Sequence, residues 1–433
     1  MKKIALISLG CEKNLVDSES ILGLFDQSKY QIISDLNDAD AIIINTCGFI
    51  VSAKEEAINT IFDCLEYQEN GTKIVVTGCL VQRYYDDLVK QIPEVDLWVP
   101  IKEYYKIGEI LERLFDDHFE HHCLSSLRRV ISTPKHLAYV RISDGCNNCC
   151  AYCAIPLIRG KFKSRNPFEI IDEVKYLIKS GRKEICLISQ DLTRYGSDLE
   201  DWSLAKLLKE LVKIPGDYVI RLLYLYPDEI TDELIETVRD NERVLNYFDI
   251  PIQHASNKLL KWMNRRGDKE FIKVLINKIR SQIPDVVIRT TIIVGFPHES
   301  NKDFNELIEF VQEMKFDHLG AFKYSKEEDT TSYFMSCQVP SAMKQLRYDQ
   351  LMETQKWISL KQNEKYLNKI YDCIIEEYDQ ENNQYIGRTY AYAPDDIDGA
   401  VIIQSDKKLE ISEVYKVEII DVDFYDIIGK ISL

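Results

Sequence analysis

The sequence predicts an α/β protein that contains an amino-terminal parallel α/β domain, a central parallel, barrel-like sheet of six βα units and a small carboxyl-terminal antiparallel β-barrel. Two observations predict the first two parts: short apolar runs rich in β-branched residues alternate with helical segments over residues 1–117 and again over 138–325. The third observation is an alternation of period two, with Gly and Asn-Asn turns, after residue 368. We therefore expect domains at 1–117, 134–367 and 368–433, with a linker at 118–133 between the first two.

The composition is that of an ordinary globular protein, with 45% hydrophobic and 29% charged residues in 433. The first residues, MKKIALISLG, form an apolar run that Glu12 and Lys13 interrupt before a signal segment or a spanning helix is complete. We therefore expect a cytoplasmic protein with no membrane partner. In that compartment the twelve cysteines are reduced thiols, available to metal.

The net charge of −17 is unevenly distributed along the chain. Residues 1–131 and 367–433 each carry a net charge of −9, whereas residues 132–366 carry +1. Acidic flanks argue against broad binding of phosphate groups, and therefore against a nucleic acid as the main partner of either flank.

The amino-terminal domain is predicted from four strands and four helices. The strands are 3–9, 41–46, 73–78 and 96–100, and the helices are 17–28, 52–68, 81–91 and one that ends near 115. Cys11, Cys47 and Cys79 follow the first three strands, each next to a glycine. Because parallel strands place their carboxyl ends at one edge of a sheet, these thiols should converge and could hold a metal cluster. The alternative is that they are small buried residues, as expected for Cys64, Cys186 and Cys373.

Four of the twelve cysteines lie in the stretch DGCNNCCAYC, residues 144–153. Cys146, Cys150 and Cys153 give the spacing C-x3-C-x2-C, and three thiolates on a four-iron cube leave one iron without a protein ligand. A zinc knuckle or a disulfide knot is the alternative, but no second C-x2-C or His pair follows within thirty residues. Cys149 also permits other spacings, and we expect it to be a bystander.

The central barrel is predicted from six strands with helices between them. The strands are 138–143, 184–190, 218–226, 245–252, 286–295 and 318–325, and the helices are 167–180, 203–213, 228–240, 268–282 and 300–314, followed by a long helix at 341–367. The cysteine loop leaves the carboxyl end of the first strand, the end at which such barrels carry their chemistry. His254 follows the fourth strand, and we expect it to be a hydrogen-bonded structural residue. His121, His122 and Cys123 of the linker are not expected to bind metal.

The cysteine loop and three further segments resemble the methylthiotransferases, a family of radical S-adenosylmethionine enzymes with two four-iron clusters. The further segments are LGCEKNLVDSE, INTCGFI and VVTGCLVQR. The first of them is similar to the branch that modifies an aspartate of a ribosomal protein, whereas the transfer-RNA branch tends to read GCQMN. The positions that discriminate are Lys13, Asn14, Val16, Asp17, Ser18 and Glu19.

The resemblance implies the cofactors and their ligands. Two 4Fe-4S clusters are expected, one on Cys146, Cys150 and Cys153 and one on Cys11, Cys47 and Cys79, and all six cysteines would be essential to catalysis. S-adenosylmethionine is expected at the first cluster, with its adenine beside Tyr152 and near Ile293 and Gly295. Gln190 and Asp191 are expected near its methionine amino group, and Arg221 near its carboxylate or ribose. The central sheet would be an open, partial (βα)6 barrel, and the carboxyl-terminal barrel would be a TRAM domain.

The implied function is transfer of a methylthio group to the β-carbon of an aspartate in small-subunit ribosomal protein twelve. The expected partners are that basic ribosomal protein and a reducing electron donor, and transfer RNA is not expected to be a partner. Two alternatives remain open at this point. One is methylthiolation of a modified adenosine in transfer RNA, and the other is a non-catalytic iron–sulfur carrier or scaffold.

Overall fold

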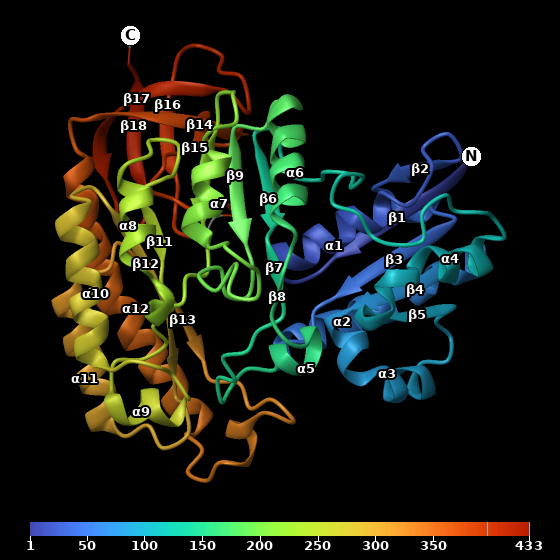
Figure 1. Cartoon of the computed structure of the whole chain (residues 1–433), viewed down its shortest axis with the longest axis horizontal. Coiled ribbons are helices and arrows are strands. Elements are labelled where there is room, and N and C mark those ends of the chain that lie inside the picture. Colours follow the sequence, from blue (N-terminus) through green and yellow to red (C-terminus); the bar gives the residue numbers. More distant parts are fainter. Residues whose placement is uncertain (396, 433) are drawn as a thin grey trace.

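A computed structural model describes residues 1–395 and 397–432; positions 396 and 433, both inside the predicted carboxyl-terminal domain, lie outside the described residues. Figure 1 shows an amino-terminal sheet beside a set of central strands, with a small barrel at one end of those strands. Among the described residues, none of the helices combines the length and the apolar character that a membrane span requires.

The amino-terminal part is a five-stranded parallel sheet in the order β2-β1-β3-β4-β5. Its elements are β1 (Lys2–Ser8), α1 (Glu12–Leu22), β2 (Tyr30–Ile33), β3 (Ala41–Thr46), α2 (Val51–Leu65), β4 (Lys73–Gly78), α3 (Cys79–Gln91), β5 (Leu97–Pro100) and α4 (Ile107–Phe115). Every residue of β3 is buried, because apolar clusters cover both faces of the sheet. The edge strand β2 was not predicted, and α1 begins five residues before the predicted helix.

The central part consists of two three-stranded parallel sheets, β6-β9-β10 and β11-β12-β13. An isolated β-bridge between Ile220 and Val244 connects them. Its elements are β6 (Leu137–Arg141), β7 (Ser143–Asp144), α5 (Ile155–Arg159), β8 (Lys163–Ser164), α6 (Pro167–Lys179), β9 (Glu184–Ile188), α7 (Leu204–Leu211), β10 (Val219–Leu222), α8 (Asp232–Arg239), β11 (Tyr247–Asp249), α9 (Asn257–Trp262), α10 (Lys269–Gln282), β12 (Val287–Val294), α11 (Asn301–Met314) and β13 (His318–Lys323). Among the described residues, β13 does not pair with β6. The predicted partial barrel of six parallel strands is therefore confirmed, and it is open.

The helix α12 (Ser341–Asn363) leads into the carboxyl-terminal barrel. The barrel closes in the order β14-β15-β16-β18-β17, from β14 (Ile370–Asp379), β15 (Gln384–Arg388), β16 (Val401–Gln404), β17 (Val414–Val422) and β18 (Ile427–Ile431). Its pairings are antiparallel except for the parallel pair β16 and β18. The predicted small barrel is thus present, with one parallel pairing that the sequence did not indicate.

The carboxyl-terminal barrel covers the amino-terminal halves of the central strands. Tyr139 of β6, Cys186 of β9 and Tyr247 of β11 form one apolar cluster with barrel residues such as Tyr392. In Figure 1 the barrel lies at the opposite end of β9 from α5, which follows the cysteine loop. The carboxyl ends of the central strands therefore stay free of the barrel and face the amino-terminal domain.

Candidate active site

A cavity of about 450 Å³ lies where the amino-terminal sheet meets the carboxyl ends of the central strands. Both predicted cysteine triads line it, which brings together residues up to 142 positions apart in sequence. The cysteines are Cys11, Cys47, Cys79, Cys146, Cys150 and Cys153. Much of the remaining wall is apolar or aromatic, including Phe49, Ile50, Ile293 and Phe322.

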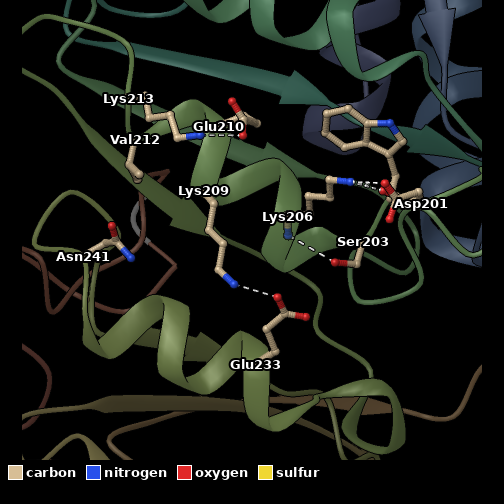
Figure 2. A pocket seen from close by; sticks show the side chains of 10 residues that line it. Asp201, Ser203, Lys206, Lys209, Glu210, Val212, Lys213, Glu233 and Asn241 are labelled. Atoms are coloured by element: carbon tan, nitrogen blue, oxygen red, sulfur yellow. Dashed lines mark hydrogen bonds and ion pairs between the residues drawn. The ribbon is translucent and has the colours of Figure 1, made fainter.

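A larger hollow of about 830 Å³ lies on the outer surface over α7 and α8, as Figure 2 shows. Lys206, Lys209 and Lys213 line it, and each forms an ion pair with a nearby carboxylate at 2.6 to 2.7 Å. None of the described residues that line this groove is a cysteine. Because its charged groups satisfy one another, we interpret it as a solvated surface groove and place the chemistry in the smaller cavity.

The amino-terminal triad comes from three loops that approach one another closely. Cys11 caps α1, Cys47 follows β3, and Cys79 is the first residue of α3. Gly10 has a φ of +89°, and a Cβ atom there would lie 2.8 Å from the Cβ of Cys47. Gly78 has a φ of +100° and packs equally tightly against the end of β3. Glycine is therefore required at both positions for these loops to reach one edge of the sheet.

Burial raises the pKa of the Cys79 thiol to about 12, and it also raises the pKa of Cys47. A cation from the central domain faces this triad, because Arg159 Nη2 lies 3.7 Å from Cys79 Sγ and 2.8 Å from Asn14 Oδ1. Arg159 Nη1 pairs with Asp17 at 2.6 Å. Arg159 thus links α1 to the segment that follows the second triad, and its charge would stabilise thiolate at Cys79.

The central triad lies on the loop between β7 and α5. Backbone N–H groups of Asn148 and Ile155 donate to the sulfurs of Cys146 and Cys153 at 3.5 Å. Arg265 Nη1 lies 3.7 Å from Cys150 Sγ. Burial raises the pKa of Cys146 and of Cys153, so the free thiols are protonated at neutral pH and must lose protons when they bind metal.

Cys149 lies outside this arrangement. It has a left-handed backbone with a φ of +51°, its side chain is exposed, and it does not line the cavity. Its carbonyl accepts a hydrogen bond of 2.9 Å from Asn264. The backbone turn at Cys149 therefore separates its sulfur from that of its neighbour Cys150, which lines the cavity.

The spacing of the sulfurs does not suit a single metal ion. Among the described residues, neither cysteine triad has its three sulfurs all within 4.8 Å of one another. Four thiolates around one zinc ion, with Zn–S bonds of about 2.3 Å, would lie about 4 Å apart. A group that does meet this limit is Glu112, His118 and His122, at the surface and away from the cavity, where the two histidines contact the Glu112 carboxylate. Three thiols in each triad are nevertheless the ligand type that iron–sulfur clusters use.

Three of the predicted cofactor contacts, Tyr152, Gln190 and Ile293, line the cavity. Gln190 Nε2 donates to Asp144 at 3.1 Å, while its buried Oε1 has no hydrogen-bond partner among the described residues. An orphaned acceptor on the cavity wall suits a ligand that carries an amino group. Tyr152 is half-buried, and desolvation raises the pKa of its hydroxyl well above the ordinary range.

Two predicted contacts lie behind the cavity wall. Asp191 is fully buried and accepts hydrogen bonds of 2.7 Å from Asn148 and Thr193. Gly295 has a φ of +76° and its amide donates to Glu299. Neither residue lines the cavity, so each can act on a ligand only through its neighbours.

The structure places Arg221 away from the cavity, contrary to its predicted place near the cofactor. Its side chain is fully buried beneath the carboxyl-terminal barrel, where it donates to Glu184 at 2.6 Å and to the carbonyl of Tyr390 at 3.0 Å. Glu184 in turn pairs with Arg388 of the barrel at 2.7 Å. The reason is positional: Arg221 lies in the middle of β10, on the face that the barrel covers, and not at the carboxyl end of the strand.

Several residues that the sequence did not single out line the cavity, including Arg159, Tyr224, Tyr226 and Arg265. Only their positions near strand ends or near the cysteine loop could have indicated them. His254 is buried, accepts a hydrogen bond of 2.9 Å from the amide of Ser256 and does not line the cavity, as expected for a structural histidine.

A second contact between the domains lies on another side of the cavity. Glu327, in the loop after β13, is buried and pairs with Arg83 of α3 and Lys54 of α2, both at 3.0 Å. Arg83 also donates to the carbonyl of Gly48, beside Cys47, at 3.0 Å. The loop that carries Cys47 is therefore tied to the central domain through Arg83.

Family models match all three parts of the chain. Residues 3–100 match "Uncharacterized protein family UPF0004", residues 140–311 match the radical SAM superfamily, and residues 369–431 match the TRAM domain. Solved structures agree with the fold. The radical S-adenosylmethionine methyltransferase TsrM from Kitasatospora setae superposes with a TM-score of 0.57 over 75% of each chain at 12% identity. The cobalamin-dependent radical enzyme OxsB superposes with a TM-score of 0.53 over 83% of this chain and 56% of that chain at 13% identity.

These matches and the cysteine loop at the carboxyl ends of a partial barrel define a radical S-adenosylmethionine enzyme with a TRAM domain. The ribosomal protein uS12 methylthiotransferase RimO of Clostridium novyi (strain NT) is 46% identical over 99% of this chain and 98% of its own length. The protein of that name from Clostridioides difficile (strain 630) is 47% identical over 100% and 99%. The chain belongs to the RimO family of methylthiotransferases, whose cofactors are S-adenosylmethionine and iron–sulfur clusters.

Proposed function

We propose that the protein transfers a methylthio group to the β-carbon of an aspartate in ribosomal protein uS12. The observation that carries this proposal is that two cysteine triads from different domains line one cavity. Relatives that match the full chain bear the name of this activity, which supports the same substrate. The transfer-RNA alternative and the carrier alternative have no such support among these relatives.

We assign Cys146, Cys150 and Cys153 to the cluster that binds S-adenosylmethionine, and Cys11, Cys47 and Cys79 to a second cluster. When bound, these groups supply a radical able to take hydrogen from an unactivated carbon, and a methylated sulfur for that carbon. Tyr152, Gln190 and Ile293 would contact S-adenosylmethionine from the cavity wall, with Asp191 and Gly295 supporting them from behind.

The protein's own residues hold the two triads on the wall of one cavity. Arg159 joins α1 to the cysteine loop, and Arg83 with Glu327 joins the Cys47 loop to the segment after β13. The apolar wall limits access of water. Fixing the reacting groups in this way supplies a large part of the catalytic effect, because it removes the entropy cost of bringing them together.

The acidic carboxyl-terminal barrel favours a basic protein partner. Its charge of −9 over residues 367–433 would attract a ribosomal protein that carries positive charge for binding ribosomal RNA, and would repel transfer RNA. Catalysis also needs an external reducing electron donor. Because the substrate is a ribosomal protein, we place the reaction in the cytoplasm.

The test is to incubate the reconstituted enzyme anaerobically with S-adenosylmethionine, a reductant and purified uS12, and to sequence the product by mass spectrometry. The proposal expects an added CH2S on one aspartate of uS12. The opposite result, unmodified uS12 together with transfer RNA that gains a methylthio group, would overturn it in favour of the transfer-RNA activity.

A further inference from the structure

We propose that Lys13 is the residue that binds the carboxylate of the aspartate substrate, and that it thereby sets the β-carbon in place. The inference rests on the proposed function, because it names the group that recognises that substrate. It concerns a cation on the cavity wall, in the first turn of α1 and two residues after Cys11.

The Lys13 side chain is nearly buried, and its ammonium group has no hydrogen-bond acceptor among the described residues. The residue is 8% exposed, and its Nζ atom lies 3.3 Å from the centre of the Tyr224 ring. Among the described residues, no acceptor lies within hydrogen-bond distance of Nζ, since the nearest carboxylate oxygen, on Glu12, is 3.8 Å away. An ammonium group has three N–H donors, and removing them from water without hydrogen-bond acceptors costs free energy. A ligand with an acidic oxygen would satisfy them.

The neighbouring groups hold Lys13 in this state. The Glu12 carboxylate forms an ion pair with Lys13 at 3.8 Å but no hydrogen bond, and it accepts hydrogen bonds of 2.9 and 3.1 Å from the Tyr224 hydroxyl. Tyr224 has a left-handed backbone with a φ of +67°, and its amide donates to Asp249 at 2.9 Å. A tyrosine in this conformation is strained, and such strain is concentrated at functional sites. Tyr224 therefore donates its hydroxyl hydrogen bond to Glu12, and the face of its ring makes a cation–π contact with Lys13.

The other cations on the cavity wall are already engaged. Arg159 pairs with Asp17, and Arg265 donates to the carbonyl of Pro251 at 2.5 Å and approaches Cys150. Lys323 donates to Gln345 at 2.7 Å. Lys13 is therefore the cavity cation, among the described residues, that keeps its hydrogen-bonding capacity for a ligand.

The substrate requires such a cation. Its reacting β-carbon is bonded to a carboxylate, which must enter a cavity with an apolar wall and two sets of thiolate ligands. Burying a carboxylate there is costly unless a cation pairs with it. Because the carboxylate and the β-carbon are joined by one bond, an ion pair with Lys13 fixes the position of the reacting carbon as well.

The test uses the reconstituted holoenzyme, a uS12 peptide with aspartate at the modified position, and the same peptide with asparagine. Lys13→Met removes the charge with little change in shape, and Lys13→Arg keeps the charge. Lys206→Met is the matched control, because Lys206 also lies over an aromatic ring, at 5.3 Å from that of Trp202, but in the surface groove of Figure 2. Peptide binding, kcat and KM, 5′-deoxyadenosine release and iron content are measured for each.

We expect Lys13→Met to lose at least about 10-fold in affinity and in kcat/KM for the aspartate peptide, the usual effect of a lost charge-assisted contact. It should also lose the preference for aspartate over asparagine while it keeps its iron and still cleaves S-adenosylmethionine. Lys13→Arg should keep the preference, and Lys206→Met should match the wild type.

Unchanged affinity and kcat/KM in Lys13→Met would overturn the inference. So would a wild-type enzyme that binds and modifies the asparagine peptide as well as the aspartate peptide, a result that needs no variant to fold. A wild-type enzyme that modifies neither peptide nor intact uS12 would instead overturn the proposed function itself, and the two failures are thereby distinguished.

Discussion

Cys149 and Cys150 are adjacent in the chain but have opposite surroundings. Cys149 is exposed on a left-handed turn, whereas Cys150 lines the cavity beside Arg265. We predict that Cys149→Ala keeps the iron of the central cluster and cleaves S-adenosylmethionine, and that Cys150→Ala loses both. Iron analysis and 5′-deoxyadenosine release after anaerobic reconstitution measure this. Loss of iron in Cys149→Ala with retention in Cys150→Ala would shift the ligand assignment by one position.

At the residue scale, the sequence indicated the site residues whose role follows from their spacing along the chain. Six cysteines at strand ends and in one loop could be found because parallel strands share an edge. Arg221 was misplaced because a strand position does not tell which face of the sheet another domain covers. Lys13 and Arg159 could not be assigned from the residues alone, because their partners, Tyr224 and Asp17, come from other domains of the chain.

At the scale of elements, α1 shows why some boundaries were missed. The predicted helix began at residue 17 because periodicity is read from apolar residues. The true first turns are polar, yet Glu12, Lys13, Asn14 and Asp17 are buried, since this face of α1 meets the central domain. The short elements β2, α5 and α9 contain four to six residues, too few to show a period.

The loop after β13 is predicted to hold the amino-terminal domain in place. Replacing Glu327 with Gln removes the buried carboxylate that Arg83 and Lys54 share. Both cations keep their ion pairs with Glu328, so the loss of stability should be smaller than the about 3 to 5 kcal/mol of a fully broken buried ion pair. We expect faster hydrogen exchange in α2 and α3 than in the wild type. Glu313→Gln, in an exposed pair with Lys273, is the control and should change little. Equal hydrogen exchange in Glu327→Gln and in the control would contradict this role of Glu327.

The contact between the carboxyl-terminal barrel and the central strands is predicted to weaken in acid. Burial alone would raise the pKa of Glu184, but Arg388 and Arg221 outweigh it and hold the pKa at about 2. Because this pKa lies below that of an unfolded glutamate, about 4.3, the stabilisation is present above that pH and is lost as the pH falls through about 2.

Urea unfolding of the metal-free chain at pH 6 and pH 3 measures this effect. The wild type should lose about 2 kcal/mol more between these conditions than Glu184→Gln, whose amide does not titrate. At pH 6 the variant should be less stable than the wild type, because Arg221 loses its carboxylate partner and Arg388 keeps only Glu376. Equal losses in both proteins would show that folding does not lower the pKa of Glu184.

At the scale of the whole molecule, the fold class followed from the sequence, but the way in which the domains meet did not. The barrel shares an apolar cluster with the central strands, so its removal would expose core residues such as Tyr139 and Tyr247. Charge reversal on its surface is therefore a better test of its role than deletion.

We predict that Glu377→Lys, Glu410→Lys and Asp421→Lys together weaken uS12 binding, since the three carboxylates are exposed on the acidic barrel. Binding to the wild type should fall as salt increases, and this dependence should be smaller in the triple variant. Cleavage of S-adenosylmethionine should persist. Identical salt dependence in the two proteins would contradict attraction by the barrel.

The central claim is that two clusters with separate tasks share one cavity, and Cys47→Ala tests it most directly. Cys47 lies in the amino-terminal domain, so its loss should leave the loop of Cys146, Cys150 and Cys153 intact. The measurement is 5′-deoxyadenosine and methylthiolated uS12 from the same anaerobic reaction, with folding checked by circular dichroism. The account predicts that Cys47→Ala still forms 5′-deoxyadenosine and yields no methylthiolated uS12. A folded variant that loses both products, together with the iron of the central cluster, would contradict it.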